Sequence, residues 1–437
     1  MSFTARPARV ASFAAAAALA LSLTACATEE EPATPTTEAT DAHAEEGHDH
    51  DEATEEHSAT ENSSKTPRIV ATYDGGIAVI DAATLETVSQ IELAGFNRLA
   101  SAGDGRHVAV STTGGWAILD AGTWSQAHGD HFHYYTADPA LSGVLIEAEI
   151  PGHVVVEDDL VALFDDGTGH VVLVEADEWT DMVEHGHAHA IGEYTTAAAH
   201  HGVAVATDED TLYVTVGTED GRTGAMLVED GEVVVESDKC PGVHGETAFE
   251  LAEETMVAFG CEDGVLLFHG EHAHKIDAPD AYGRTGNLFS SDESNVILGD
   301  YKTDPEGGLG LSQITLTNVE DETLTVVDPF AGADALYTWR GLTRGEDGEV
   351  LVLGTDGALR VIDPATGEVT TTIDVIDAWG VPEEWQTAHP SLTVLEGMAY
   401  VTDPAAGTIT AVDYVGGEVW KSAESGIAFN EVVGVTG

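Results

Sequence analysis

The chain has 437 residues, of which 79 are Asp or Glu and 15 are Lys or Arg, so its formal net charge is −64. This charge repels phosphate backbones and anionic substrates, which argues against a nucleic-acid partner. It also concentrates cations around the protein, although a solvated, salt-tolerant acidic surface is the simpler explanation of most of the charge. That explanation does not account for the 20 histidines.

Residues 1–25 are typical of a secretory signal peptide. Arg6 and Arg9 form a basic start, an Ala/Leu-rich run follows, and the sequence LTA before Cys26 matches a lipobox, which is cut before a cysteine that then carries lipid. A transmembrane helix is the alternative, but the apolar run is too short. We therefore expect a lipoprotein in the cell envelope, anchored at Cys26 on the extracytoplasmic face of the cytoplasmic membrane.

Residues 26–66 are predicted to form a disordered tether rich in His, Asp and Glu. Beyond Cys26 the segment has hardly an aliphatic side chain larger than alanine, so it cannot bury enough surface to offset the entropy of ordering. It contains HAEEGHDHDEATEEH, with His43, His48, His50 and His57. Such tracts bind metal loosely and in several geometries. An acidic spacer with incidental histidines is the alternative.

Residues 67–437 are predicted to be an all-β domain, because short β-branched runs alternate with Gly, Asp and Asn turns and no long stretch keeps a helical period. Three segments align by eye: RIVATYDGGIAVIDAATLETVSQIEL, EVLVLGTDGALRVIDPATGEVTTTIDV and MAYVTDPAAGTITAVDYVGGEVWKS. Each reads as three strands of a four-stranded blade. With less regular copies between them, the spacing indicates a β-propeller of about eight blades, or seven if the middle contains one unit fewer.

The two ends of this domain are expected to share a blade. The first unit lacks a preceding strand, and the last residues, GIAFNEVVGVTG, supply one without a partner. Pairing of the N- and C-terminal strands would close the ring and remove the open sheet edges.

Histidines recur at similar places in these units. In AHGDHFHYY, His131 and His133 share one face if the segment is extended, and single histidines stand where an inner strand begins in several later units. In a propeller these positions meet around the channel mouth on one face. The candidate metal ligands are His131, His133, His153, His200, His201, His244 and His389. For any single member, a hydrogen-bonded structural histidine is the competing interpretation.

Several neutral imidazoles with carboxylates nearby suit Zn²⁺ first, and Cu²⁺ or Ni²⁺ are chemically acceptable. Which subset closes on the ion cannot be chosen from spacing. The histidines of EHGHAHA and HGEHAH fall near outer strands or turns and are interpreted as solvated or weak secondary sites. His107 and His170 are interpreted as structural.

Cys240 and Cys261 remain once Cys26 is assigned to the lipid anchor. An even pair in an exported protein favours a disulfide over a thiolate metal site.

Sequence motifs of common hydrolases and nucleotide-binding proteins are missing from the chain: it has no nucleophile elbow, no Gly-rich loop ending in Gly-Lys and no His-Glu-x-x-His. A propeller can still run metal-dependent hydrolysis if the ion keeps an open position and a base is near; Asp130, Glu246 and Asp165 are the candidates for that base.

The chain resembles the periplasmic zinc metallochaperones of the AztD type, which work with a zinc ABC importer. The resemblance rests on GDHFHYY, PGHVVVEDDLVALFDDGTG, AHHGVAV, CPGVHGETA with GCEDG, and AHPSL. It implies a propeller, a zinc site drawn from the seven histidines above, and a mobile His/Asp-rich N-terminal segment that helps to pass zinc to the importer's solute-binding protein. The lipid anchor departs from the family pattern.

The sequence therefore predicts a monomeric zinc chaperone that catalyses no reaction. A metal-dependent propeller hydrolase, of lactonase or esterase type, and an interaction scaffold without metal are the alternatives.

Overall fold

The computed structural model describes residues 59–251 and 254–437. The predicted signal peptide, the lipidation site Cys26 and the tether histidines His43, His48, His50 and His57 lie outside the described residues. The predicted all-β fold is confirmed: the described residues form eight sheets of four or five strands and one sheet of three. None of their helices is long and apolar enough to cross a membrane.

The chain's ends meet in one sheet. Its order is β36 (Val432–Val435), β2 (Arg68–Tyr73), β3 (Gly76–Asp81) and β4 (Thr87–Glu92). Strands β36 and β2 are antiparallel, with Val433 opposite Val70. The C-terminal strand thus supplies the edge partner that the first repeat lacks.

The remaining large sheets follow one another along the chain, and a helical segment lies between β13 and β14. In the order of their pairing, the second sheet contains β5 (Arg98–Ser101), β6 (His107–Thr112), β7 (Gly115–Asp120) and β10 (Ala140–Glu147), and the third contains β11 (Pro151–Glu157), β12 (Leu160–Asp165), β13 (His170–Glu175) and β14 (Gly192–Thr195). The fourth sheet contains β15 (Ala204–Asp208), β16 (Thr211–Thr218), β17 (Gly221–Glu229) and β18 (Glu232–Ser237). The fifth contains β19 (His244–Leu251), β20 (Glu254–Cys261), β21 (Asp263–His269) and β22 (His272–Asp277), with β23 (Gly283–Arg284) beside β21. The helical segment comprises the 3-10 turn η1 (Ala176–Glu178) and the helix α1 (Trp179–His185).

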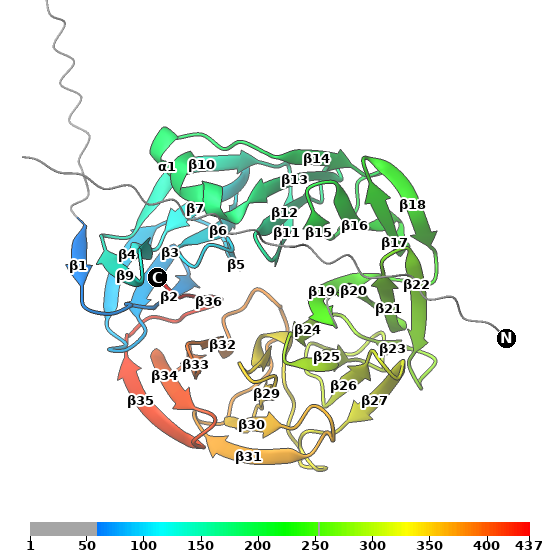
Figure 1. The fold of residues 1–437 in the computed structure, drawn as a ribbon. Helices are drawn as coiled ribbons and strands as arrows, with labels where there is room; N and C mark the ends of the chain where they lie inside the picture. Colours follow the sequence, from blue (N-terminus) through cyan, green and yellow to red (C-terminus); the bar gives the residue numbers. More distant parts are fainter. Residues whose placement is uncertain (1–58, 252–253) are drawn as a thin grey trace, which may run out of the picture. The chain divides into compact units, whose positions relative to one another are not determined.

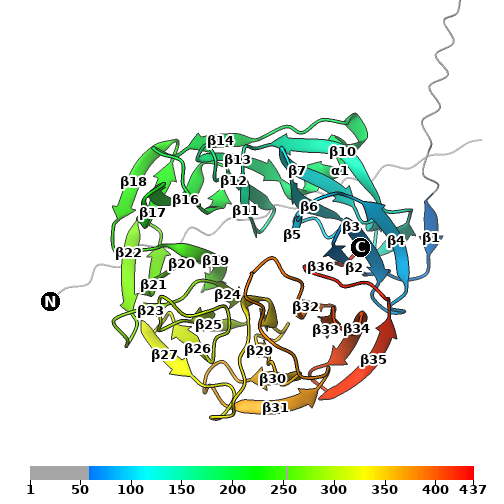
Figure 2. The ribbon, with the colours of Figure 1, turned by 180° about the vertical axis from the view of Figure 1, so that it is seen from behind.

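Three further sheets complete the set, together with a second 3-10 turn, η2 (Trp339–Gly341). The sixth sheet contains β24 (Leu288–Ser291), β25 (Ser294–Tyr301), β26 (Gln313–Asn318) and β27 (Thr323–Val327). The seventh contains β28 (Leu342–Arg344), β29 (Val350–Leu353), β30 (Ala358–Ile362) and β31 (Val369–Asp374). The eighth contains β32 (Ser391–Leu395), β33 (Met398–Asp403), β34 (Thr408–Asp413) and β35 (Glu418–Glu424). Figures 1 and 2 show the large sheets following one another around a ring, with the first strand of each near the centre.

The hydrophobic core lies between neighbouring sheets. Strands β2 and β3 bury Val70 and Val79 against Val108 of the next sheet, while Ile69 on the other face packs in a cluster with Tyr400 of the last sheet. The middle strands are buried on both faces, which is why their sequences are nearly continuous β-branched runs instead of alternating ones. Packing on both faces places every sheet edge-on to the ring's centre, so the starts of the first strands converge.

One hairpin departs from the repeat. After β7 the chain forms β8 (Thr123–His128) and β9 (His131–Thr136), and the outer strand beside β7 is the later β10. The hairpin pairs with β1 (Thr60–Asn62), a short strand that precedes the expected domain boundary at residue 67. The hairpin is therefore an insertion in the second sheet.

Candidate metal centre

Three histidines from three successive sheets meet. His153 lies in β11, His201 precedes β15 and His244 begins β19. Their ring centroids are 5.1–5.3 Å apart, and one ligand atom from each lies within 4.8 Å of the others. We call them the cavity triad. These residues, 48 and 43 positions apart along the chain, are brought together because each lies in or just before the first strand of its sheet.

Each ring of the cavity triad has an oxygen atom within hydrogen-bond distance of its Nδ1. His153 Nδ1 lies 3.1 Å from Glu246 Oε1, His201 Nδ1 lies 2.5 Å from Asp166 Oδ2, and His244 Nδ1 lies 2.5 Å from the Gly286 carbonyl oxygen. A carbonyl can only accept, so His244 Nδ1 must carry the proton and its Nε2 keeps the lone pair. Ionised carboxylates impose the same tautomer on the other two rings. This is the outer shell that metal-ligating histidines usually have.

Glycines beside the histidines allow this close approach. Gly245 has φ +48°, a left-handed conformation, and a Cβ there would lie 2.5 Å from the Gly286 oxygen that holds His244. A Cβ on Gly152 would lie 2.3 Å from Asp166 Oδ1. Larger residues at either position would displace the acceptors that orient the rings.

The surroundings shift the pKa values of His153 and His244 in opposite directions. Burial acts to lower the pKa of His153, but the charge of Glu246 and the hydrogen bond to it outweigh burial, so the pKa is raised. Burial and the neighbouring His153 lower the pKa of His244 well below its ordinary value. A proton entering the cluster therefore goes to His153, beside Glu246, while His244 stays neutral and available to a metal.

The cavity triad faces a cavity of about 510 Å³. Its other lining residues include three basic side chains, two tryptophans and the buried carboxylate of Asp300: Arg98, Arg284, Lys302, Trp339, Trp385 and Asp300. A metal held by the three imidazoles would have its fourth tetrahedral position directed to this space.

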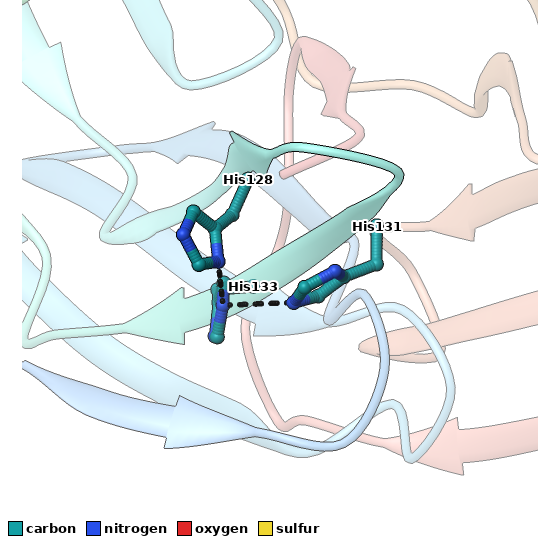
Figure 3. Close-up of side chains that lie close together, drawn as sticks. All are labelled: His128, His131 and His133. Atoms are coloured by element: carbon teal, nitrogen blue, oxygen red, sulfur yellow. Dashed lines mark hydrogen bonds between the residues drawn. The ribbon is translucent and has the colours of Figure 1, made fainter. Parts of the chain in front are cut away.

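A second group of histidines lies on the inserted hairpin (Figure 3). A two-residue turn at Gly129 and Asp130 places His128 directly opposite His131, and His133 lies on the same face two residues later. We call these three the hairpin triad. His133 Nε2 lies 3.2 Å from His131 Nε2 and 3.3 Å from His128 Nδ1. Tetrahedral zinc with Zn–N bonds of about 2.0–2.1 Å separates its ligand nitrogens by about 3.3 Å.

The hairpin triad has a thinner supporting shell than the cavity triad. Glu61 Oε1, from β1, lies 2.7 Å from His133 Nδ1, and Asp130 Oδ1 lies 3.3 Å from His131 Nδ1. His128 and His131 are exposed, and the side chain of Asp130 is fully exposed. His133 is half-buried, and no oxygen partner of the His128 ring is found among the described residues.

His131 and His133 were expected beside His153 at one channel mouth, and the structure divides that set. The expectation assumed that the hairpin connects one blade to the next, whereas it pairs with β1 as a separate three-stranded sheet. The candidate ligands therefore fall into two groups in the described part of the chain, with His128 joining the second.

His200 and His389 join neither group. His200 is buried, with Nδ1 2.9 Å from the Ala198 oxygen and Nε2 3.0 Å from Thr215 Oγ1, so both ring nitrogens are engaged. The next residue, His201, lines the cavity. His389 is buried near Arg340, and burial together with that guanidinium lowers its pKa to about 4. A second cation is disfavoured there.

The remaining histidines behave as the sequence indicates. His107 is fully buried, with Nδ1 2.5 Å from Asp104 Oδ2, and His170 Nδ1 lies 3.1 Å from Thr195 Oγ1. Neither outer set forms a three-ligand group among the residues that the structure describes; these are His185, His187, His189, His269, His272 and His274.

The carboxylates considered as a general base are all engaged or remote. Asp165 accepts the backbone N–H groups of Glu149, Ile150 and Gly167 in a turn. Burial acts to raise its pKa, but these bonds and the Thr168 hydroxyl lower it. Glu246 orients His153, and Asp130 lies on the hairpin. The arrangement favours holding an ion over activating a water on it.

Cys240 and Cys261 form the predicted disulfide, with their Cα atoms 4.9 Å apart. The bond joins the segment before β19 to the end of β20, so it fixes the strand that His244 begins.

Sequence reasoning did not identify Asp166 and Gly286 as supporting residues, nor His128 as a ligand. Glycine next to histidine was a usable signal: GHV, HHG and VHG belong to the cavity triad, whereas AHP does not. For Asp166 and Gly286 no local signal exists, because their acceptor roles arise between neighbouring sheets.

The comparisons point in one direction. No family model matches the chain. It is 27% identical over 298 residues to "Zinc chaperone AztD" of Citrobacter koseri, a match covering 65% of this chain and 66%, just under two thirds, of that protein. The crystal structure of Citrobacter koseri AztD has a TM-score of 0.71 with 21% identity, covering 86% of this chain and 99% of that one, and the apo AztD structure has a TM-score of 0.69 over 85% and 99%.

The resemblance to AztD seen in the sequence is thus found again in both comparisons. At 21% identity the structural likeness shows a shared fold. The relative's name describes that protein as a zinc chaperone.

Proposed function

We propose that this protein is an extracytoplasmic zinc chaperone that holds Zn²⁺ on His153, His201 and His244. The observation that carries the proposal is the oxygen at each of the three Nδ1 atoms, which leaves the Nε2 lone pair of each ring for a metal beside the cavity. Three neutral nitrogen ligands with an open fourth position suit Zn²⁺ first. The curated relative's name supports zinc as the cargo.

We propose the hairpin triad as a second, weaker and faster-exchanging zinc site. Its nitrogens have the spacing of a tetrahedral ion, but two of its three rings, those of His128 and His131, are exposed. His200 and His389 are left out of both proposed ligand sets because of their hydrogen bonds and surroundings.

The fold proposed for this function is an eight-bladed β-propeller closed by the β36–β2 pairing. The eight large sheets and the antiparallel register of Val433 and Val70 support it. In this arrangement the cavity triad lies where three neighbouring blades meet near the axis, which gives rigid support to its ligands.

Delivery is proposed to proceed by direct handover to the solute-binding protein of a zinc ABC importer. Release of an ion from a site held by rigid strands is slow, whereas a tethered imidazole that reaches the ion forms a mixed-ligand intermediate at high effective concentration. The sequence between Cys26 and β1 offers His43, His48, His50 and His57 for this step, and lipidation at Cys26 would keep the protein at the membrane. These parts rest on the sequence and on the resemblance.

A titration with a transfer assay tests the proposal. Purified protein is expected to bind Zn²⁺ in competition with a chromophoric chelator, tightly at one site and weakly at others. Alanine at the four tether histidines is expected to slow transfer to the solute-binding protein while leaving tight binding nearly unchanged. Transfer no faster than loss of zinc to a chelator would contradict direct handover, and absence of tight binding would contradict the site.

One observation supports a metal-dependent hydrolase as the second candidate function. Three histidines with an open fourth position also describe catalytic zinc sites. Turnover of an ester, lactone or phosphoester that stops on chelation and returns with zinc would favour it. We expect no such turnover, since Glu246 is committed to His153.

A further inference from the structure

The cavity beside the triad gathers positive charge in a protein that has very little. Of the 15 basic residues in the chain, Arg98, Arg284 and Lys302 line this one cavity. Arg98 is neutralised by Glu431, with Nε 3.0 Å from Oε1. Arg284 and Lys302 form no ion pair within 4.0 Å of any carboxylate that the structure describes.

Arg284 and Lys302 are also direct neighbours. They form an antiparallel bridge in which each backbone N–H donates to the other's carbonyl oxygen at 2.9 Å. Residues paired in this way carry their side chains on the same face, and like charges directly opposite each other are destabilising. Lys302 Nζ finds only a neutral acceptor, the Gly307 oxygen, at 2.7 Å. No carboxylate that the structure describes forms an ion pair with either of them, and the charge of Asp300 interacts with Arg284 from beyond ion-pair distance.

Asp300 is the nearest candidate for a counter-charge, and its bonds are already used. Its Oδ1 accepts the backbone N–H groups of Gly286 and Asn287, and its Oδ2 accepts the Asn287 side-chain amide at 2.6 Å. Asp300 thus fixes the loop that carries the Gly286 oxygen behind His244. Its carboxylate belongs to the support of the triad, and the two cations face the cavity.

We infer that this cavity binds a small dicarboxylate, which places one carboxylate on the open position of the zinc ion and the other against Arg284 and Lys302. The inference rests on the proposed zinc site, which supplies the first attachment point. Carboxylate oxygen is an accepted fourth ligand for zinc beside histidine nitrogens. A paired guanidinium and ammonium are the groups that charge-assisted hydrogen bonds to a second carboxylate require.

The size and lining of the cavity suit a small organic anion. A volume of about 510 Å³ lies within the usual range for small-molecule sites. Trp339 and Trp385 supply apolar walls for a short carbon chain. The strongly negative protein surface repels anions in general, so a local cationic pocket selects those that also gain a metal contact.

Cobalt substitution gives a direct readout, because the visible absorption of Co²⁺ reports its ligands and does not depend on any activity. The Co²⁺-loaded protein is titrated with succinate and, separately, with butyrate, which has the same carbon number and only one carboxylate. Succinate is expected to change the visible spectrum and to bind at least about tenfold more tightly than butyrate, because only succinate reaches the two cations.

Variants test whether succinate binding depends on Arg284 and Lys302 themselves or on the positive charge of the protein in general. Arg284→Gln with Lys302→Gln is expected to abolish the preference for succinate while Co²⁺ affinity stays within about threefold, which also shows that the variant is folded. Lys302→Gln alone should give an intermediate preference. Lys421→Gln removes a positive charge from β35, outside the cavity lining, and should behave as the wild type.

The possible failures are distinguishable. Co²⁺ binding with equal affinity for succinate and butyrate, or an unchanged preference in the double variant, overturns this inference and leaves the zinc site standing. Absence of Co²⁺ and Zn²⁺ binding in the wild type overturns the proposed function and this inference with it.

Discussion

The cavity triad and the hairpin triad use the same ligand type in opposite settings. The hairpin triad already has nitrogen separations of 3.2 and 3.3 Å but is exposed and supported by Glu61 and Asp130. The cavity triad has ring centroids 5.1–5.3 Å apart, close to the 4.9–5.3 Å of the hairpin triad, but every ring has an oxygen from the surrounding fold at its Nδ1. The two triads thus differ less in spacing than in support, and we expect the better supported one to bind zinc more tightly.

Removing each triad in turn is the largest test of this comparison. Alanine at His153, His201 and His244 is expected to weaken the tightest zinc binding by about a thousandfold or more, since all three nitrogen ligands are lost. Alanine at His128, His131 and His133 is the matched control and should leave the tight site within about threefold. Competition with a chromophoric chelator measures both. If the hairpin variant loses the tight site instead, spacing dominates and the comparison is inverted.

Removal of the disulfide should affect the two triads differently, because the bond supports the cavity triad and not the hairpin triad. Serine at both Cys240 and Cys261 removes a bond across a separation of 21 residues, and on the chain-entropy account the free energy of unfolding should fall by about 3 kcal/mol. Denaturant unfolding of oxidised and reduced protein measures this. Zinc binding at the cavity triad should weaken because His244 begins the clamped strand, while binding at the hairpin triad should not change. Equal loss at both sites would indicate general unfolding.

The supporting carboxylates give the next smaller effect. Glu246→Gln keeps the size of the side chain but removes the charge that orients His153, so zinc affinity at the cavity triad should fall by about 10- to 100-fold. Glu61→Gln is the equivalent change at the hairpin and should alter affinity there by less than about threefold, because water already screens that pair. Similar losses in both variants would show that the two shells do not differ in strength.

Much of the fold was predictable because it depends on local, repeated patterns. β-branched runs, Gly and Asp turns and three alignable segments indicate an all-β domain of recurring four-stranded units, and the two cysteines left for one disulfide form it. The inserted hairpin was not predictable. Whether β8 or β10 becomes the outer partner of β7 is decided by tertiary packing, and both sequences suit a strand.

The site was predictable only in part for a related reason. His153, His201 and His244 were selected because they stand near the starts of recurrent strands, where the ring brings residues together. His200 was selected with them, but both of its ring nitrogens are hydrogen-bonded away from the cavity triad, to Ala198 and Thr215. Whether a ring faces a cavity or a neighbour such as Thr215 depends on contacts between sheets.

The pH dependence of zinc binding is the finest test of the two settings. Zinc binds neutral imidazole, so protons compete with it, and the competition begins at higher pH when the pKa is raised. Glu246 raises the pKa of His153 despite its burial, and burial keeps His244 neutral to lower pH, so His153 is the residue through which acid first weakens the cavity site. Between pH 7.5 and 5.5 affinity at this site should fall by about tenfold or more. Glu246→Gln removes the charge that favours the imidazolium, so its affinity should start lower at pH 7.5 but fall less steeply with acid. Parallel pH profiles for the two proteins would show that Glu246 only positions the ring. A shallower profile in the variant would show that the carboxylate which strengthens the zinc ligand also makes it sensitive to acid.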